Sequence, residues 1–371
     1  MRIVSVSRRT DIPAFYSRWF LNRIQAGFCH WINPFGGQVQ RVSLRPQDCL
    51  ALVFWTRNPK PLLPHLAALR ELGFRFYFHF TINGYPRLLE SNSPPLAEAI
   101  SAFRRLSDVI SPALTFWRYD PILLSEATSE AYHQQQFEAL ARQLEGYTQR
   151  CYFSFVDRYG KTARNLAQVE RASSLTFREP TIEERLSLVR ALGSIASDHG
   201  IQLYSCCEDE LLAVGVQKAH CIDLGLIQSL WPNLDVRVKV APTRADCGCV
   251  EAADIGAYDT CVYGCAYCYA TNSRRAALQR LRDHDPDDTS LWRPATLHGV
   301  DLASVEQVRP SRPPGSDERA FYVLKQACLF EDAKGTVTGD SSRNFPANRA
   351  GIKARSERAK SPRETETTVG I

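Results

Sequence analysis

Six runs of apolar residues, many of them β-branched or aromatic, recur through the first 206 positions, and segments with helical spacing separate them. The runs are Ile3–Ser7, Leu50–Thr56, Phe74–Ile82, Leu114–Tyr119, Cys151–Val156 and Ile201–Cys206. Strands that are almost continuously apolar are typical of a parallel sheet buried on both faces. Alternation of such strands with helices is the pattern of repeated βα units. The sequence therefore predicts an α/β fold.

Helical spacing is clearest in the segment after Thr181. Thr181 and Glu184 have the spacing of a capping box, in which each side chain accepts a hydrogen bond from the other residue's backbone N–H. An apolar stripe follows, and Gly200 stands where a C-terminal cap is expected. Similar stripes lie near Leu96 and Phe137, and all of them are expected to pack into the core.

Polar side chains stand at the carboxyl end of each predicted strand. Because strands joined by right-handed crossovers are parallel, these ends meet at one edge of the sheet, where α/β proteins place their ligands. Each such residue alone could simply mark where a strand reaches solvent, but the whole series favours a polar pocket. Arginines bind carboxylate or phosphate in a forked geometry, so we expect a small, anionic substrate. The residues predicted to bind or act on it are Arg8, Asp11, Arg118, Asp120, Asp157 and Glu208.

The chain has twelve cysteines, which is many for a reducing compartment, where thiols bind metals or pack in cores more often than they form disulfides. Five stand alone and are expected to be packing residues: Cys29, Cys49, Cys151, Cys221 and Cys328. Five others lie within 22 residues and are expected to carry chemistry: Cys247, Cys249, Cys261, Cys265 and Cys268.

The spacing Cys-x3-Cys-x2-Cys at Cys261, Cys265 and Cys268 helps to choose between zinc and an iron–sulfur cluster, the metals that suit thiolates. Zinc sites usually combine two Cys-x2-Cys or Cys-x2-His pairs, and this segment has one. Three thiolates in one short loop can instead bind three irons of a [4Fe–4S] cluster, and the fourth iron then stays open to a small molecule. Gly264 lets the backbone turn sharply there. The pattern favours the cluster, with zinc as the alternative.

Cys247 and Cys249, separated by one glycine, admit three interpretations. Their thiols can face one metal, but a disulfide between them would be strained. They could supply a fourth ligand to the same cluster, hold a second metal, or join the loop cysteines in a zinc site. Cys206 and Cys207, at a strand end directed toward the same edge, could contribute as well, while one of the pair is expected to be a buried packing residue.

The cysteine loop resembles the hallmark of radical S-adenosylmethionine enzymes, Cys-x3-Cys-x-aromatic-Cys. Its string Gly-Cys-Ala-Tyr-Cys-Tyr-Ala is especially similar to the members related to spore photoproduct lyase. The resemblance implies a [4Fe–4S] cluster whose open iron binds S-adenosylmethionine, reductive cleavage to a 5′-deoxyadenosyl radical, and a reductant protein as partner. It also implies a partial βα barrel. Tyr267, the aromatic of the motif, would lie beside the adenine or pack the loop against the barrel.

In the resembling enzymes the cysteine loop follows the first strand, whereas here it follows all six predicted strands. We therefore expect a βα-barrel-like fold that is partial or permuted relative to a TIM-type barrel, or a loop that folds back over the open face.

The whole of residues 1 to about 306 also resembles a bacterial family known as domain of unknown function 1848. The likeness lies in residues 5–16, 54–60, 117–122 and 254–261, of which the first stretch reads Ser-Val-Ser-Arg-Arg-Thr-Asp-Ile-Pro-Ala-Phe-Tyr. This family implies no activity, so the chemistry must be inferred from the residues.

Composition divides the chain into a βα-barrel-like domain at 1–240, a cysteine-rich segment at 241–306 that packs on it, and a tail at 307–371. The tail is too poor in large apolar residues to order itself, so we expect disorder.

The net charge of +5 gives little reason for a polyanionic partner, although the likeness to a DNA-repair lyase leaves nucleic acid open. No stretch approaches the ~20 apolar residues of a membrane span and the start lacks a signal-type run, so we expect a cytoplasmic protein without a membrane partner.

Two functions of different classes fit these features. The first is an iron–sulfur enzyme that acts on a small, anionic molecule. The second is a binding protein in which the cysteines hold zinc to fasten the fold and the polar edge binds a ligand without turnover.

Overall fold

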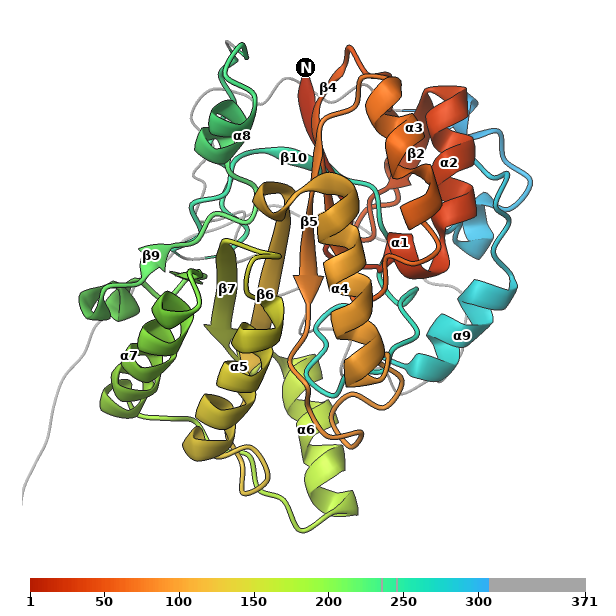
Figure 1. Cartoon of the computed structure of the whole chain (residues 1–371). Coiled ribbons are helices and arrows are strands. Elements are labelled where there is room, and N and C mark those ends of the chain that lie inside the picture. Colours follow the sequence, from red (N-terminus) through yellow and green to blue (C-terminus); the bar gives the residue numbers. More distant parts are fainter. Residues whose placement is uncertain (235, 245, 307–371) are drawn as a thin grey trace, which may run out of the picture. The chain divides into compact units, whose positions relative to one another are not determined.

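A parallel sheet organises the chain in the computed structural model, which describes residues 1–234, 236–244 and 246–306. Within that part the strand order is β10-β1-β4-β5-β6-β7-β8-β9, and each neighbouring pair is parallel. The strands are β1 (Arg2–Val6), β4 (Cys49–Thr56), β5 (Phe76–Thr81), β6 (Thr115–Ile122), β7 (Arg150–Phe155), β8 (Gln202–Ser205), β9 (Gln217–Lys218) and β10 (Ala252–Asp254). Their carboxyl ends consequently meet at one edge of the sheet (Figure 1).

All six predicted strands are present, as β1, β4, β5, β6, β7 and β8, with ends that differ by a few residues. The sequence pattern missed the short strands β9 and β10, and it missed the antiparallel hairpin of β2 (Phe28–Ile32) and β3 (Val39–Ser43). β10 reads Ala-Ala-Asp, a sequence with little strand propensity, and it is extended because it pairs with β1. The hairpin strands mix polar with apolar residues, so they form no continuous apolar run.

The helices predicted near Leu96, near Phe137 and after Thr181 are confirmed as α4, α5 and α7. The capping box of α7 is confirmed as well, because the side chains of Thr181 and Glu184 each accept a hydrogen bond from the other's backbone N–H. Gly200, just after this helix, has the positive φ of +67° that favours glycine. The helices are α1 (Ile12–Phe15), α2 (Ser17–Ala26), α3 (Leu66–Glu71), α4 (Leu96–Ile110), α5 (Glu130–Leu144), α6 (Gly160–Ala172), α7 (Ile182–Asp198), α8 (Leu224–Leu230) and α9 (Arg274–Arg282).

Buried side chains fill both faces of the sheet. On the first face Phe54 stacks on Phe78, with ring centroids 4.4 Å apart, and α4, α5 and α7 cover this layer (Figure 1). On the second face Trp55 and His79 stand in register on β4 and β5, with ring centroids 5.2 Å apart. Three of the cysteines predicted to be packing residues are buried in the core of the first face, namely Cys29, Cys49 and Cys151.

The segment of residues 219–250, which includes α8, covers the second face. Ile222 and Ile227 from this segment are fully buried and belong to the same core cluster as Tyr77, Phe116 and Tyr152 of the sheet. This packing brings a cysteine-containing segment over strands whose carboxyl ends carry the predicted site residues.

The described residues all belong to one compact unit. β10, which lies in the predicted cysteine-rich segment, is part of the same sheet as β1. The α/β class is thus confirmed as a parallel sheet with helices, while β9 and β10 stand at opposite ends of the strand order. The predicted tail and Cys328 lie outside the described residues. None of the helices in the described part is both long and apolar enough to cross a membrane.

Candidate functional site

The cysteine loop, residues 255–273, leaves the carboxyl end of β10 and lies against the segment that follows β1. The Thr10 hydroxyl donates a hydrogen bond to the carbonyl of Ala257 at 2.7 Å, and the Tyr16 hydroxyl donates to the carbonyl of Thr260 at 2.8 Å. These contacts hold the loop at the same edge of the sheet as the polar strand-end residues.

The loop also contacts the segment that follows β5. Cys265 stands opposite Glu90 in an antiparallel bridge, and the N–H of Ala266 donates to the carbonyl of Leu89 at 2.9 Å. Gly264 has a φ of +72°, in the left-handed region, which agrees with the sharp turn predicted there. The loop is therefore fixed by hydrogen bonds on two sides, to the segments after β1 and after β5.

A buried network of four polar side chains lies where the loop meets β4 and β5. Arg57 donates to the Tyr267 hydroxyl at 2.6 Å and forms an ion pair with Glu90 at 3.0 Å. The Asn83 amide donates to the Tyr267 hydroxyl at 3.0 Å and to the Glu90 carboxylate at 3.1 Å. The Tyr267 hydroxyl in turn donates to Glu90. The Tyr267 side chain therefore anchors the loop, and its predicted place beside an adenine stays a prediction. Sequence reasoning missed Glu90, which belongs to no motif.

The three loop thiols are near enough to influence one another. Charge on Cys265 or Cys268 raises the pKa of Cys261, although burial is the larger cause of the rise. Burial likewise raises the pKa of Cys265 to about 12. Among the described residues no hydrogen bond joins any two of the three thiols, and no three His, Cys, Asp or Glu side chains already stand as a metal-binding group. A metal bound here would displace the thiol protons.

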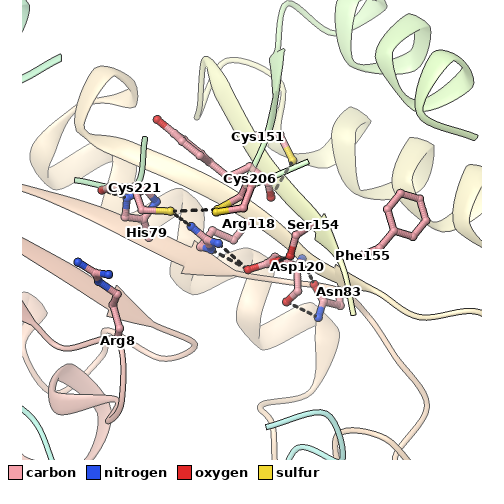
Figure 2. Close-up of polar contacts among 12 residues, drawn as sticks. Arg8, His79, Asn83, Arg118, Asp120, Cys151, Ser154, Phe155, Cys206 and Cys221 are labelled. Carbon is pink, nitrogen blue, oxygen red and sulfur yellow. Dashed lines mark hydrogen bonds and ion pairs between the residues drawn. The ribbon is translucent and has the colours of Figure 1, made fainter. Parts of the chain in front are cut away.

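Arg118 on β6 connects two groups of the strand-end edge. It forms an ion pair with Asp120 at 2.5 Å, and the same carboxylate accepts a hydrogen bond from Ser154. On its other side Arg118 donates to the Sγ of Cys221 at 3.1 Å. Figure 2 shows its guanidinium between Asp120 and the Cys206–Cys221 pair. The structure thus brings Arg118 and Asp120 together, as their strand-end positions predict.

Asp11 and Arg8 have different surroundings. The Asp11 carboxylate accepts hydrogen bonds from the backbone N–H groups of Ala14 and Arg57, at 3.0 and 2.6 Å, and so caps α1. Burial raises the pKa of Asp11 to about 6. The Arg8 guanidinium lies over the ring of Trp55, 5.7 Å from its centroid, and its Nε is buried without a hydrogen-bond partner. Arg8 is therefore the freer of the two side chains to bind a ligand.

Asp157 and Glu208 are both paired with arginines. Asp157 forms an ion pair with Arg244, and Glu208 forms one with Arg185 at 3.4 Å. Glu208 also accepts a hydrogen bond from the N–H of Phe155 at 3.2 Å, and burial raises its pKa to about 7. Their contacts hold together segments at the ends of β7 and β8.

Cys247 and Cys249 lie near cysteines other than those of the loop. Five neighbouring thiols form a group that we call the thiol ring, namely Cys206, Cys207, Cys221, Cys247 and Cys249, in which Cys206 contacts two thiols directly and Cys247 and Cys249 interact electrostatically with Cys207 and Cys221. The Sγ of Cys206 lies 3.9 Å from that of Cys207 and 3.6 Å from that of Cys221. Interactions with the thiols of Cys206 and Cys249 lower the pKa of Cys221. Cys221, predicted to be a packing residue because it stands alone in the sequence, is thus a member of a cysteine cluster.

The comparisons with known proteins give one finding about kinship. The family model described as domain of unknown function (DUF1848) matches residues 3–270. This range runs from β1 to the end of the cysteine motif, so it includes the strand-end residues and the thiol ring. None of the curated proteins compared with the chain matches it.

Proposed function

The chain belongs to the DUF1848 family, which assigns no activity, and we propose from its own residues that it is an iron–sulfur enzyme of the radical S-adenosylmethionine type. In this proposal Cys261, Cys265 and Cys268 hold a [4Fe–4S] cluster whose fourth iron is left for S-adenosylmethionine. Once bound, these groups would supply a 5′-deoxyadenosyl radical, with an electron from a reductant protein. The substrate is a small, anionic molecule bound at the strand-end edge.

The observation that carries the proposal is the place of the cysteine loop in the sheet. β10 is the last strand in sequence, but in space it is an edge strand beside β1. Counted from β10, the strands follow one another as β10, β1, β4, β5, β6, β7 and β8, so the loop follows the first strand of the series. This is the position of the loop in the enzymes that its motif resembles. We therefore interpret the sheet as a permuted partial βα barrel.

The arrangement of the loop thiols supports a cluster over a single ion. In a [4Fe–4S] cluster each thiolate binds a different iron, so the ligand sulfurs surround the cluster without touching one another. Around one zinc ion they would stand about 3.8 Å apart, given Zn–S bonds of about 2.3 Å. Charge on Cys268 raises the pKa of both Cys261 and Cys265, yet no hydrogen bond joins any two of the three thiols within the described part of the chain.

The chain's own residues would divide the remaining tasks. The Arg57, Glu90 and Tyr267 network fixes the loop backbone beside Cys265. Arg8 is best placed to bind an anionic group of the substrate, because its guanidinium has no ion pair or hydrogen bond with another described residue. The half-buried Arg8 guanidinium keeps a cation–π contact with Trp55, and an anionic ligand would add a charge-assisted hydrogen bond to it.

Anaerobic purification followed by iron and sulfide analysis tests the proposal. We expect about four irons and four sulfides per chain, with a broad visible absorption that bleaches on reduction by dithionite. Single replacement of Cys261, Cys265 or Cys268 by Ala should remove most of the iron, because the triad has no spare ligand.

Matched controls are available among the buried packing cysteines. Replacement of Cys29, Cys49 or Cys151 by Ala should leave the iron content unchanged, since these thiols lie in the core of the first face. A protein that stays colourless and free of iron and sulfide after anaerobic reconstitution would contradict the proposal and leave the metal-stabilised binding protein as the better interpretation.

A further inference from the structure

The thiol ring joins three segments that are distant in sequence. Cys206 and Cys207 follow β8, Cys221 lies between β9 and α8, and Cys247 and Cys249 precede β10. The last two segments belong to the stretch that covers the second face of the sheet. Within the described residues the ring shares no hydrogen bond with the loop cysteines, and the proposed activity makes no use of it.

Two sulfur–sulfur distances in the thiol ring match those around a single zinc ion. Zn–S bonds are about 2.3 Å long, and the edge of a tetrahedron is about 1.63 times the distance from its centre to a corner, which gives about 3.8 Å. The Sγ of Cys206 lies 3.6 Å from that of Cys221 and 3.9 Å from that of Cys207. A disulfide requires about 2.05 Å. The loop triad differs from the ring, because no hydrogen bond joins two of its thiols within the described residues.

Positive charge and N–H donors surround the ring. Four thiolates around Zn²⁺ carry a net charge of −2, which is costly to bury without compensation. Arg118 donates to the Sγ of Cys221 at 3.1 Å, and Arg244 donates to that of Cys206 at 3.6 Å (Figure 2 shows the former contact). Groups that donate to ligating atoms in this way orient and stabilise the ligands of a metal.

The backbone at two positions brings the thiols together. Cys207 has a φ of +64°, which is uncommon for a residue with a side chain and is retained only where the surrounding structure enforces it. Gly248 lies against the imidazole of His220, so that a Cβ there would stand 2.3 Å from the ring. A larger residue between Cys247 and Cys249 would therefore require the His220 imidazole to move.

We propose that the thiol ring is a zinc site, in which Cys221, Cys247, Cys249 and one thiol of the Cys206–Cys207 pair bind a single zinc ion. Among the described residues the thiols do not already stand as a metal-binding group, so binding involves rotation about χ1 and the release of four thiol protons. Four protein ligands make a closed, structural site. Such a site fastens residues 219–250 across the second face of the sheet and keeps Arg118 directed along the strand-end edge.

Elemental analysis of the full chain, purified anaerobically from zinc-supplemented medium, tests this proposal. We expect one zinc per chain, lost in each of C221S, C247S and C249S, and lost in one of C206S and C207S but not in the other. C151S is the matched control, a buried thiol outside the ring, and should keep the zinc. The triple variant C261A/C265A/C268A should keep its zinc and lose its iron, so failure of this proposal is distinguishable from failure of the proposed function.

Since a ring variant that fails to fold would also lose zinc, a second measurement uses the wild-type chain. After removal of zinc with a chelator, added Co²⁺ should give the thiolate-to-cobalt and ligand-field absorption of a tetrahedral thiolate site. Absence of these bands would overturn the proposal. Zinc retained at one per chain in both C221S and C249S would overturn it as well, and so would a disulfide between two ring thiols in protein kept from oxygen.

Discussion

Replacing Glu90 by Gln is predicted to destabilise the protein strongly, because the change leaves the buried guanidinium of Arg57 without its counter-charge. The Glu90 carboxylate and the Arg57 guanidinium are 3.0 Å apart, and the side chains are 5% exposed for Glu90 and 12% exposed for Arg57. The same carboxylate accepts hydrogen bonds from Asn83 and Tyr267. Because Tyr267 belongs to the cysteine loop, the variant tests how that loop is held to the sheet.

The magnitude follows from the geometry of the pair. At an effective dielectric constant of about 20, two unit charges 3.0 Å apart attract one another by about 5.5 kcal/mol. Part of this loss is recovered, because the Gln oxygen still accepts hydrogen bonds, Arg57 keeps its contact with the Tyr267 hydroxyl at 2.6 Å, and the cost of burying the Glu90 charge disappears. Removal of one partner of a buried ion pair typically costs about 3–5 kcal/mol, which is the change in the free energy of unfolding that we expect.

Urea unfolding at pH 7, followed by tryptophan fluorescence, measures this change. Glu98→Gln is the matched control, since the Lys60–Glu98 pair has the same separation of 3.0 Å while its side chains are 50% and 56% exposed. Exposed pairs contribute at most about 1 kcal/mol, so the control should unfold close to the wild-type midpoint. Equal destabilisation in the two variants, or a loss below about 1 kcal/mol in Glu90→Gln, would refute the reasoning.

Three further predictions concern stability and use the same unfolding assay. Phe54→Ala should cost about 3–5 kcal/mol, because the ring is fully buried and stacks on Phe78; a cost under about 1 kcal/mol would show that the layer can collapse around the cavity. Thr181→Ala should cost about 1 kcal/mol through loss of the capping box, and Thr181→Ser should restore most of it; equal stability of the two variants would count against the cap. Burial lowers the pKa of His133 to about 4, so the unfolded chain takes up this proton more readily than the folded protein. The free energy of unfolding should therefore fall as the pH drops from 6.5 toward 4, by up to about 3 kcal/mol, and His133→Gln should remove that part of the pH dependence. Plots of the free energy of unfolding against pH that stay parallel for wild type and variant would contradict this prediction.

The long strands could be predicted from the sequence because a strand buried on both faces needs a continuous apolar run, which is a local property. The capping box of Thr181 and Glu184 is equally local. β10 could not be predicted, because Ala252–Asp254 becomes a strand only through its ladder with Ile3, Val4 and Ser5. The position of the cysteine loop beside β1 depends on that pairing. The observation that most supports the proposed function is thus a property of the tertiary fold.

The candidate site divides in the same way. The loop cysteines lie within eight residues, so their motif is visible in the chain. The thiol ring is assembled from residues that meet only when the covering segment packs on the sheet, and Cys221 carries no local signal at all. Glu90 is a similar case, since its role arises from contact with Arg57 and Tyr267 rather than from any motif.

Formation of 5′-deoxyadenosine tests the central claim most directly. Reconstituted, reduced protein mixed with S-adenosylmethionine should produce this nucleoside slowly even without substrate, in proportion to its cluster content. Cys268→Ala should produce none, and the packing-cysteine variant Cys151→Ala should match the wild type. An intact, reducible cluster whose spectrum does not change on addition of S-adenosylmethionine, and which yields no 5′-deoxyadenosine, would contradict the account.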